Sequence, residues 1–291
     1  MEGFPLFVGG EARAFTRAPP IIRRMTAAQW LRRWWRLGRL ALHLLRGLVL
    51  TAFLFPLQSK ERRKREVEHW SMQLLTLLGV RLFLHGSPPP YGVCPLMLVA
   101  NHVSWLDILA IDAITPARFV ARSEVRLWPL IGWLCARSGT VFINRNRRND
   151  TARVNARISE ALREGDVFAV FPEGTTSDGS TLLKFHASLL EPALEAEAAI
   201  QPIALWYDRS DGTPCTEVAY DGDRSVWDVL MGVTSQREIL AHVCFLDPIV
   251  VMDRGRRDIA REARDAILLT LFPQARYSRS AQDADLPAAV Q

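Results

Sequence analysis

A histidine and an aspartate five positions apart carry the strongest chemical signal in the chain. His102 and Asp107 follow the apolar run Leu96–Ala100, which has the length and composition of a buried strand. Ligands of open α/β sheets bind beyond the carboxyl ends of the strands, which is where His102 would lie. Five residues of a regular helix cover about 500°, so the two side chains meet only if the chain turns between them. At a strand–turn–helix junction, Asp107 would orient an imidazole that takes a proton from a hydroxyl.

The same residues also have a purely structural interpretation. Ser104 and Asp107 have the spacing of a capping box at the start of a helix, and His102 would then be an ordinary loop histidine. The local sequence leaves both interpretations open, so residues elsewhere in the chain have to decide between them.

A second apolar run, Val167–Phe171, also ends in a polar loop. The sequence Pro-Glu-Gly-Thr-Thr-Ser-Asp-Gly follows it at residues 172–179. Backbone N–H groups of such a loop can surround an anion, and Glu173 could hold a substrate hydroxyl or an arginine. The alternative is a turn that is rich in glycine and hydroxyl residues and has no role in binding.

A third apolar run, Thr140–Ile143, precedes a group of arginines that begins at Arg145. Arginines at a strand end can grip a phosphate or a carboxylate through paired hydrogen bonds. A solvated basic turn is the alternative. A fourth segment, residues 201–205, is a buried strand that opens at a proline, and by itself it indicates no function.

In this order and spacing, the four segments together resemble the lysophosphatidic acid acyltransferase family of glycerolipid acyltransferases. Residues 101–107 match the family's block of histidine, four residues and aspartate, and residues 139–145 match a block from glycine to arginine around a Phe-Ile pair. Residues 171–175, Phe-Pro-Glu-Gly-Thr, match the third block, and residues 201–205 are similar to the fourth, proline-containing block. The resemblance covers residues 80–250.

The resemblance implies transfer of an acyl chain from a thioester to the free hydroxyl of a lysolipid, with 1-acyl-glycerol-3-phosphate converted to phosphatidate as the first expectation. His102 would be the general base and Asp107 its partner. The donor would be acyl-CoA or acyl carrier protein, and no metal or redox cofactor is implied. The acceptor oxygen attacks the thioester directly, and the chain indeed contains no Gly-x-Ser-x-Gly nucleophile elbow. The residues expected to bind the acceptor are Arg145, Glu173, Gly174, Thr175 and Thr176.

Two positions depart from the family pattern. Thr176 stands where many members carry arginine, and His186 stands where many carry lysine. The chain therefore lacks two cations that would face an acceptor phosphate. The Thr-Thr-Ser-Asp-Gly sequence and the stretch Tyr220–Ser225 also resemble acyltransferases that act on lyso-ornithine lipids, whose headgroup carries a carboxylate and an amine. Lyso-ornithine lipid is therefore the alternative acceptor.

Two other classes of function compete with acyl transfer. A thioesterase or lysophospholipase could use the same His102–Asp107 pair to activate water. A non-catalytic membrane adaptor could use only the basic N-terminal segment, although the intact pair and Glu173 argue against it. The four cysteines are scattered, without CxxC or zinc spacing, and are interpreted as reduced core thiols.

The elements that must position these residues alternate in type from Val80 onward. This alternation predicts an α/β domain with a mixed, mostly parallel sheet flanked by helices. The expected strands are Val80–Leu84, Leu96–Ala100, Phe119–Ala121, Thr140–Ile143, Val167–Phe171, Ile200–Leu205, Glu217–Tyr220 and Ile239–Phe245. The expected helices are Asp107–Ile114, Val125–Arg137, Asp150–Glu164, Leu182–Ala196, Val226–Met231 and Arg257–Leu271.

Two further helices are expected before this domain. Residues 27–57 read as a helix, but its uninterrupted apolar run, Gly47–Leu57, is shorter than the ~20 residues that a spanning helix needs. Tryptophans interleaved with arginines at residues 30–39 are typical of a lipid headgroup layer. An interfacial or re-entrant helix is therefore favoured over a spanning helix or a soluble core helix. A second helix, Lys60–Leu78, would complete a hairpin on the membrane.

The charge distribution supports a membrane as the partner. Residues 1–65 contain 14 basic and 3 acidic residues, whereas the remainder contains 22 and 28. The basic residues flank the apolar stretch, which fits an anionic lipid surface better than nucleic acid. We expect membrane association at the cytoplasmic face of the inner membrane, because basic flanks stay inside. The expected parts are an irregular segment (1–25), a membrane-associated two-helix region (26–79), a catalytic domain (80–274) and a polar tail (275–291).

Overall fold

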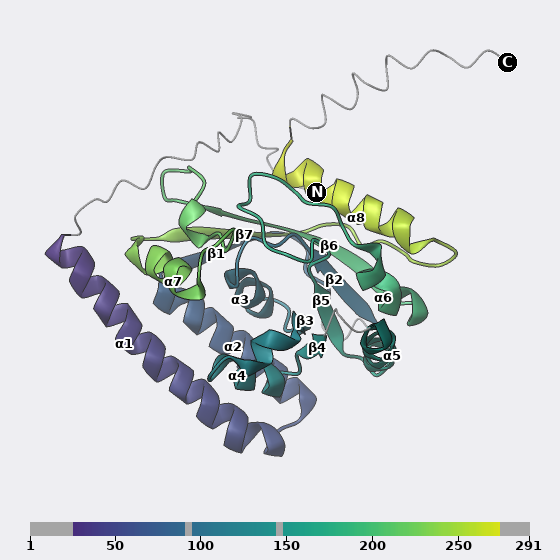
Figure 1. Cartoon of the computed structure of the whole chain (residues 1–291), viewed down its shortest axis with the longest axis horizontal. Coiled ribbons are helices and arrows are strands. Elements are labelled where there is room, and N and C mark those ends of the chain that lie inside the picture. The colour runs from purple at the N-terminus through teal and green to yellow at the C-terminus, as the bar shows by residue number, and fades with distance from the viewer. Residues whose placement is uncertain (1–25, 91–94, 144–147, 274–291) are drawn as a thin grey trace, which may run out of the picture.

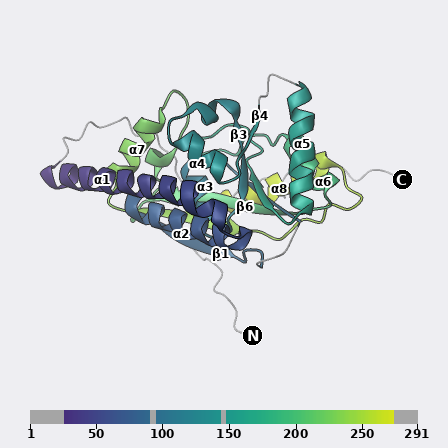
Figure 2. The ribbon, with the colours of Figure 1, turned by 90° about the horizontal axis from the view of Figure 1, so that it is seen from below.

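The computed structural model of the chain describes residues 26–90, 95–143 and 148–273 (Figure 1). A central sheet lies between two layers of helices, and a two-helix hairpin runs along one side (Figures 1 and 2). The irregular segment expected at residues 1–25 and the polar tail expected at residues 275–291 lie outside the described residues. An α/β domain preceded by a helical hairpin, as the sequence predicts, is confirmed.

Seven strands form one sheet. They are β1 (Val80–Gly86), β2 (Leu96–Ala100), β3 (Arg118–Arg122), β4 (Val141–Ile143), β5 (Val167–Val170), β6 (Ala199–Asp208) and β7 (Ile239–Phe245). Their order is β1-β7-β6-β2-β5-β3-β4, and every neighbouring pair is parallel except β6 and β7. The expected mixed, mostly parallel sheet is therefore confirmed. Because β2 lies between β5 and β6 and is parallel to both, the carboxyl ends of these three strands meet at one edge.

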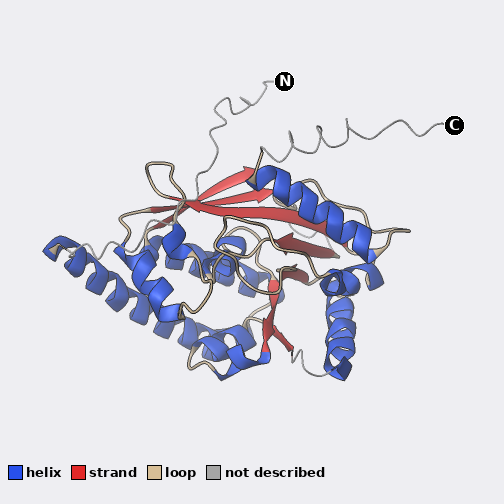
Figure 3. Cartoon of the chain, turned by 45° about the horizontal axis from the view of Figure 1, so that its top comes forward, coloured by secondary structure: helices blue, strands red, loops and turns tan. Residues whose placement is uncertain are grey.

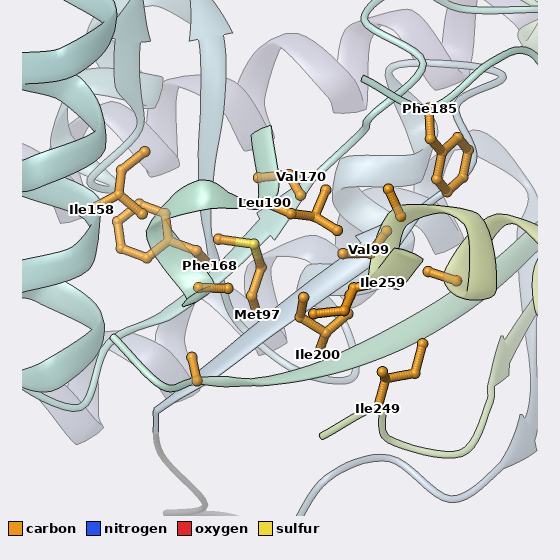
Figure 4. Packing of buried hydrophobic residues seen from close by; sticks show 14 of the residues in the cluster. Met97, Val99, Ile158, Phe168, Val170, Phe185, Leu190, Ile200, Ile249 and Ile259 are labelled. Carbon is orange, nitrogen blue, oxygen red and sulfur yellow. The ribbon is translucent and has the colours of Figure 1, made fainter. Parts of the chain in front are cut away.

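Helices cover both faces of the sheet (Figure 3). They are α1 (Ala27–Val49), α2 (Lys60–Leu78), α3 (Leu106–Asp112), α4 (Ile131–Arg137), α5 (Arg148–Arg163), α6 (Glu191–Glu195), α7 (Val226–Ser235) and α8 (Arg256–Leu271). On one face α5, α6 and α8 pack over side chains such as Met97, Val99 and Phe168 (Figure 4). On the other face α2, α3 and α7 form the core with side chains such as Leu98. Burial on both faces explains why β2 and β5 are apolar throughout.

The N-terminal hairpin is one long helical stretch folded back on α2. After α1 the chain passes through a π-helical turn (Leu50–Leu54) and a 3-10 turn (Phe55–Leu57). His43 stacks on Trp70 with 4.9 Å between the ring centroids, so the inner face of α1 is packed while many outer residues are exposed. The stretch Trp30–Leu57 is long and apolar enough to cross a membrane by length and composition.

One expected helix, Val125–Arg137, is split in two. A 3-10 turn covers Ser123–Leu127, and α4 begins only at Ile131. Between them Pro129 has no N–H to continue a helix, and Leu130 adopts a φ of 63°. These two residues turn the chain and leave a loop between two short helical pieces.

Two other expectations about local structure are wrong. The segment expected as a strand, Glu217–Tyr220, forms a 3-10 turn at Thr216–Val218 because the Arg224 guanidinium donates to three carbonyls of this segment. The helix expected over Leu182–Ala196 is reduced to a 3-10 turn followed by the five residues of α6. In both places tertiary hydrogen bonds and packing override the local pattern.

Candidate active site

The loop after β2 is fixed to the neighbouring strand β6 by a buried amide. The Asn101 side chain donates to the Leu205 carbonyl at 2.8 Å and accepts from the Leu205 N–H at 2.7 Å. It thereby replaces the ladder contacts that end where β2 ends. The next residue, His102, starts the turn into α3 and lies at the edge where the ends of β2, β5 and β6 meet.

His102 and Asp107 are brought into contact by this turn. The His102 Nδ1 donates to the Asp107 Oδ2 at 2.8 Å. The same oxygen accepts from the backbone N–H groups of Val103 and Ser104 at 2.7 and 2.9 Å. Asp107 thus satisfies free N–H groups at the start of α3 and also orients the imidazole, so it combines both roles that the sequence left open. The Ser104 hydroxyl takes no part in a capping box and has no partner among the described residues.

A tyrosine from β6 completes the surroundings of the carboxylate. The Tyr207 hydroxyl donates to the Asp107 Oδ1 at 2.6 Å, and both side chains are buried. Burial and the negative charge of Asp107 raise the pKa of Tyr207 well above its ordinary value, so the hydroxyl keeps its proton and stays a donor. The sequence reasoning missed Tyr207, because it is one apolar-looking position in a strand 100 residues after its partner.

Among the described residues, Nδ1 is the imidazole nitrogen that has a hydrogen-bond partner. Because Nδ1 is held by Asp107, Nε2 is left to exchange a proton with a substrate. The ring stacks on Phe171, with centroids 3.9 Å apart and planes inclined by 11°. About a fifth of the His102 side chain is exposed (19%), whereas that of Asp107 is fully buried. The buried Asp107 therefore holds the imidazole in place, while part of the His102 side chain is accessible to a substrate.

Tyr207→Phe is expected to lower kcat about 10-fold, because it removes one hydrogen bond to a charged group, typically worth about 1.5–3 kcal/mol. Without that donor the Asp107 carboxylate is held less firmly, and so is the Nδ1 contact that orients the imidazole. KM should change little, because the Tyr207 side chain is buried. Steady-state kinetics that separate kcat from KM test this positioning role. A kcat equal to that of the wild type in a folded Tyr207→Phe protein would show that Tyr207 is only structural.

Glu173 is buried and bound to the backbone on both sides. Its Oε1 accepts from the His102 N–H at 2.7 Å, and its Oε2 accepts from the Leu183 N–H at 2.8 Å. Burial raises the pKa of Glu173, and these two N–H groups oppose that effect. The contact with the His102 N–H ties the loop after β5 to the loop after β2. Glu173 thereby fixes the backbone of His102.

The remaining residues of the expected acceptor site differ in position. Gly174 has a left-handed φ of 72° and turns the chain after Glu173. Thr175 is exposed, and the Thr176 hydroxyl donates to the Tyr220 carbonyl. Arg145 lies outside the described residues. The structure therefore brings together the histidine, the aspartate and the glycine-bearing loop, with the stretch beginning at Tyr220 against them.

An apolar cavity of about 300 Å³ lies between the hairpin and the catalytic domain. Its walls come from α1, α2, α3, α4 and the segment around Tyr220. Trp105 and Tyr220 line it close to His102, since Trp105 belongs to the same turn and the Tyr220 N–H donates to the Val103 carbonyl at 2.9 Å. Burial raises the pKa of Asp112, which also lines the cavity, to about 8, so this carboxyl is mostly neutral at pH 7.

No group of three or more histidine, cysteine, aspartate or glutamate residues that could hold a metal ion occurs among the described residues. Of the cysteines that the structure describes, Cys215 is buried, and burial raises its pKa to about 12. Burial also raises the pKa values of Cys135 and Cys244. None of these three thiols is therefore prepared as a thiolate nucleophile at neutral pH.

Known proteins with a similar sequence and a similar fold are acyltransferases. The family model described as Acyltransferase matches residues 91–206. A lyso-ornithine lipid O-acyltransferase of Pseudomonas aeruginosa is 38% identical over 210 residues, which cover 72% of this chain and 80% of that protein. A 1-acyl-sn-glycerol-3-phosphate acyltransferase of Neisseria meningitidis serogroup B is 36% identical over 64% of this chain and 72% of that protein. The crystal structure of the 1-acyl-sn-glycerophosphate acyltransferase PlsC from Thermotoga maritima has the same fold, with a TM-score of 0.64, 20% identity, and coverage of 84% of this chain and 95% of that one.

Proposed function

Because this chain belongs to the glycerolipid acyltransferase family, and is therefore an O-acyltransferase of membrane lysolipids, we propose that His102 is its general base. The observation that carries the proposal is the 2.8 Å contact between the His102 Nδ1 and the buried Asp107 carboxylate. It leaves Nε2 accessible at the strand edge where ligands of α/β sheets bind. An apolar cavity for an acyl chain begins in the same turn, at Trp105.

In the proposed reaction the His102 Nε2 takes the proton from the acceptor hydroxyl as its oxygen attacks the thioester carbonyl carbon. The tetrahedral intermediate collapses with cleavage of the carbon–sulfur bond, and the leaving thiolate receives the proton from the imidazolium. The Asp107 carboxylate stabilises the imidazolium while it exists. Direct attack needs no enzyme nucleophile, in agreement with the raised pKa values of the described thiols.

The acyl chain of a substrate is proposed to lie in the cavity between the hairpin and the domain. Almost all of its lining is apolar, and the Asp112 carboxyl in its wall is mostly neutral at pH 7. A hydrocarbon chain gains free energy from leaving water at every methylene that it buries there. The length of the chain that fits should therefore be limited by the size of the cavity, about 300 Å³.

Lyso-ornithine lipid is the acceptor that the geometry supports best. Thr176 is neutral and its hydroxyl is bound to the Tyr220 carbonyl, so this position supplies no cation for a phosphate. The same contact brings the acidic stretch that contains Asp221 and Asp223 against the loop after β5, where carboxylates could bind an amine. The P. aeruginosa relative carries the corresponding name.

Lysophosphatidate remains the second candidate acceptor. The N. meningitidis relative is named for that substrate, and Arg145 comes two residues after the last residue of β4 in the sequence; its guanidinium could bind a phosphate. The proposed donor is acyl-CoA or acyl carrier protein, and no cofactor is proposed. The proposed location is the cytoplasmic face of the inner membrane, supported by the basic residues on both sides of the apolar helix.

An acceptor panel tests the function. The detergent-solubilised protein would receive labelled acyl-CoA or acyl carrier protein donors of increasing chain length, with lyso-ornithine lipid, lysophosphatidate or other lysophospholipids. We expect label in ornithine lipid and a sharp fall in rate beyond one chain length. Label only in phosphatidate would overturn the acceptor assignment and keep the mechanism. Free fatty acid formed equally fast without acceptor would instead identify a hydrolase.

A further inference from the structure

The split helix described above leaves a second apolar segment on the surface, distant in sequence from the hairpin. We call residues 123–137 the η3–α4 edge, since they comprise the 3-10 turn Ser123–Leu127 and α4. Leu127 is 83% exposed and Leu130 is 53% exposed. Trp128, Ile131 and Trp133 are between 36% and 38% exposed. Five large apolar side chains within seven residues form a patch, which the surface of a soluble domain rarely shows.

The η3–α4 edge is continuous with the outer face of the hairpin. Figure 1 places α4 beside the end of α1, and Figure 2 shows α1 and α4 together on the face that turns toward the viewer. Close contacts between α4 and the π-helical turn Leu50–Leu54 join the two elements. The outer face of the hairpin adds Trp35 and Leu42 of α1 and Phe53 of the π-helical turn, which are 66%, 69% and 70% exposed.

The hairpin is held in place against the domain. The Arg33 guanidinium donates to the Met231 carbonyl at 3.1 Å, and the Arg36 guanidinium donates to the Gln236 carbonyl at 2.6 Å. These contacts keep the first half of α1 along the side of the catalytic domain. A helix held in this way can present its long outer face to a bilayer. The η3–α4 edge beside it would then face the same bilayer.

The backbone of the η3–α4 edge is fixed in the shape that exposes its apolar side chains. Leu130 has a φ of 63°, a strained conformation for a branched residue, and its side chain points into no core cluster. Gly132 allows α4 to pack tightly on the preceding turn, since a Cβ there would lie 2.3 Å from the Arg126 carbonyl oxygen. The exposure of Leu127 and Leu130 is therefore built into the fold.

The charges around the patch fit an anionic lipid surface. The exposed Arg126 and Arg137 lie over the rings of Phe142 and Trp133, at 5.9 and 5.2 Å. Arginines and tryptophans around exposed leucines are the composition of segments that sit at the headgroup layer. Because the η3–α4 edge lies beside the basic, tryptophan-rich α1, a single bilayer can cover both surfaces.

We infer that the η3–α4 edge is a second membrane-inserting element, which docks the catalytic domain on the bilayer together with the outer face of α1. Two residues of the patch, Trp128 and Ile131, also line the apolar cavity, together with Leu134 of α4 and with Leu44 and Phe55 of the hairpin. Docking would therefore place the wall of the cavity at the lipid surface, so that an acyl chain passes from the bilayer to the site without crossing water. The passage of an acyl chain through the cavity rests on the proposed function. The docking of the η3–α4 edge on a bilayer does not depend on it.

The double variant Leu127→Asp/Leu130→Asp tests this inference, because neither side chain lines the cavity. Flotation with vesicles of phosphatidylcholine and phosphatidylglycerol measures binding. We expect a partition coefficient lower by about 10-fold or more, because two inserted leucines are replaced by anions. Activity in detergent micelles should equal that of the wild type, while activity on vesicles falls in parallel with binding. If the wild-type protein had no acyltransferase activity, the proposed function would be wrong, but the comparison of vesicle binding would still test the docking.

The matched control is Val250→Asp/Met252→Asp. These residues are 65% and 67% exposed and precede α8, which Figure 1 shows on the opposite side of the molecule from α1 and α4. The control should bind vesicles as the wild type does. Wild-type binding by the Leu127/Leu130 variant would overturn the inference, and so would an equal loss in the control. Unchanged vesicle binding with activity lost only toward acyl carrier protein would identify a protein partner for this surface instead of a bilayer.

Discussion

His102→Ala is expected to lower the rate of acyl transfer by about 10²- to 10⁴-fold, the range in which a positioned general base acts. The substitution removes the nitrogen that would accept the proton of the acceptor hydroxyl. It leaves the other contacts of the Asp107 carboxylate intact, with two backbone N–H groups and the Tyr207 hydroxyl. The protein should therefore remain folded and bound to membranes while kcat falls.

The measurement is transfer of a labelled acyl chain to the preferred acceptor at saturating substrate. His69→Ala is a suitable control, because His69 is exposed on α2 and bonded only to Gln73 among the described contacts. It should keep wild-type activity. If His102→Ala retained more than about a tenth of the wild-type activity, His102 would not be the general base, because a general base typically contributes at least about 10²-fold to the rate.

Asp107→Asn is expected to lower kcat by about 10²-fold or more, because it removes a charge while preserving shape. The amide oxygen can accept from the His102 Nδ1–H and from the N–H groups of Val103 and Ser104, as the Oδ2 does now. The amide nitrogen can donate to the Tyr207 oxygen, whose hydroxyl now donates to the Oδ1. Folding should be largely retained, but the imidazolium that forms in the reaction loses its counter-charge.

Asp107→Ala provides the contrast. It leaves buried N–H groups without partners, at a typical cost of about 1–3 kcal/mol each, so the free energy of unfolding should fall as well as the activity. Urea unfolding measured beside kcat separates the two effects. Nearly full activity in a folded Asp107→Asn protein would show that the aspartate acts only as a helix cap.

Much of the site follows from patterns that are local in the sequence. An apolar run that passes into a polar loop marks the end of a buried strand, and parallel strands place such ends at one edge. This is why a contact between His102 and Asp107 at a strand end could be predicted before it was known, whereas Glu173 was assigned to the site through the family resemblance. The amphipathic period of α2 and α8 likewise made both helices predictable within about a residue of their ends.

The tertiary structure decided what depends on residues far apart in the chain. Tyr207 reaches Asp107 only because β6 lies beside β2, and Glu173 holds the backbone of His102 only because β5 lies on the other side of β2. Glu217–Tyr220 was expected as a strand, but the hydrogen bonds of Arg224 hold a 3-10 turn at Thr216–Val218 instead. A single sequence has no pattern for such pairs, because hydrogen bonding across the fold leaves no trace in local periodicity.

The cavity and the surface around it also depend on tertiary packing, whereas the elements that form them were largely predictable from the sequence. The sequence by itself determined an α/β domain with a basic, apolar hairpin, because strand ends, helical periods and charge clusters are short-range properties. Acyl transfer was predicted from the resemblance of four sequence blocks to a known family. Only the tertiary structure decided that α1, α2, α3 and α4 line one apolar cavity that reaches Trp105, in the turn that carries His102, and that the η3–α4 edge lies beside the hairpin. The reason is physical: a cavity or a composite surface exists only after helices from separate parts of the chain have packed against one another.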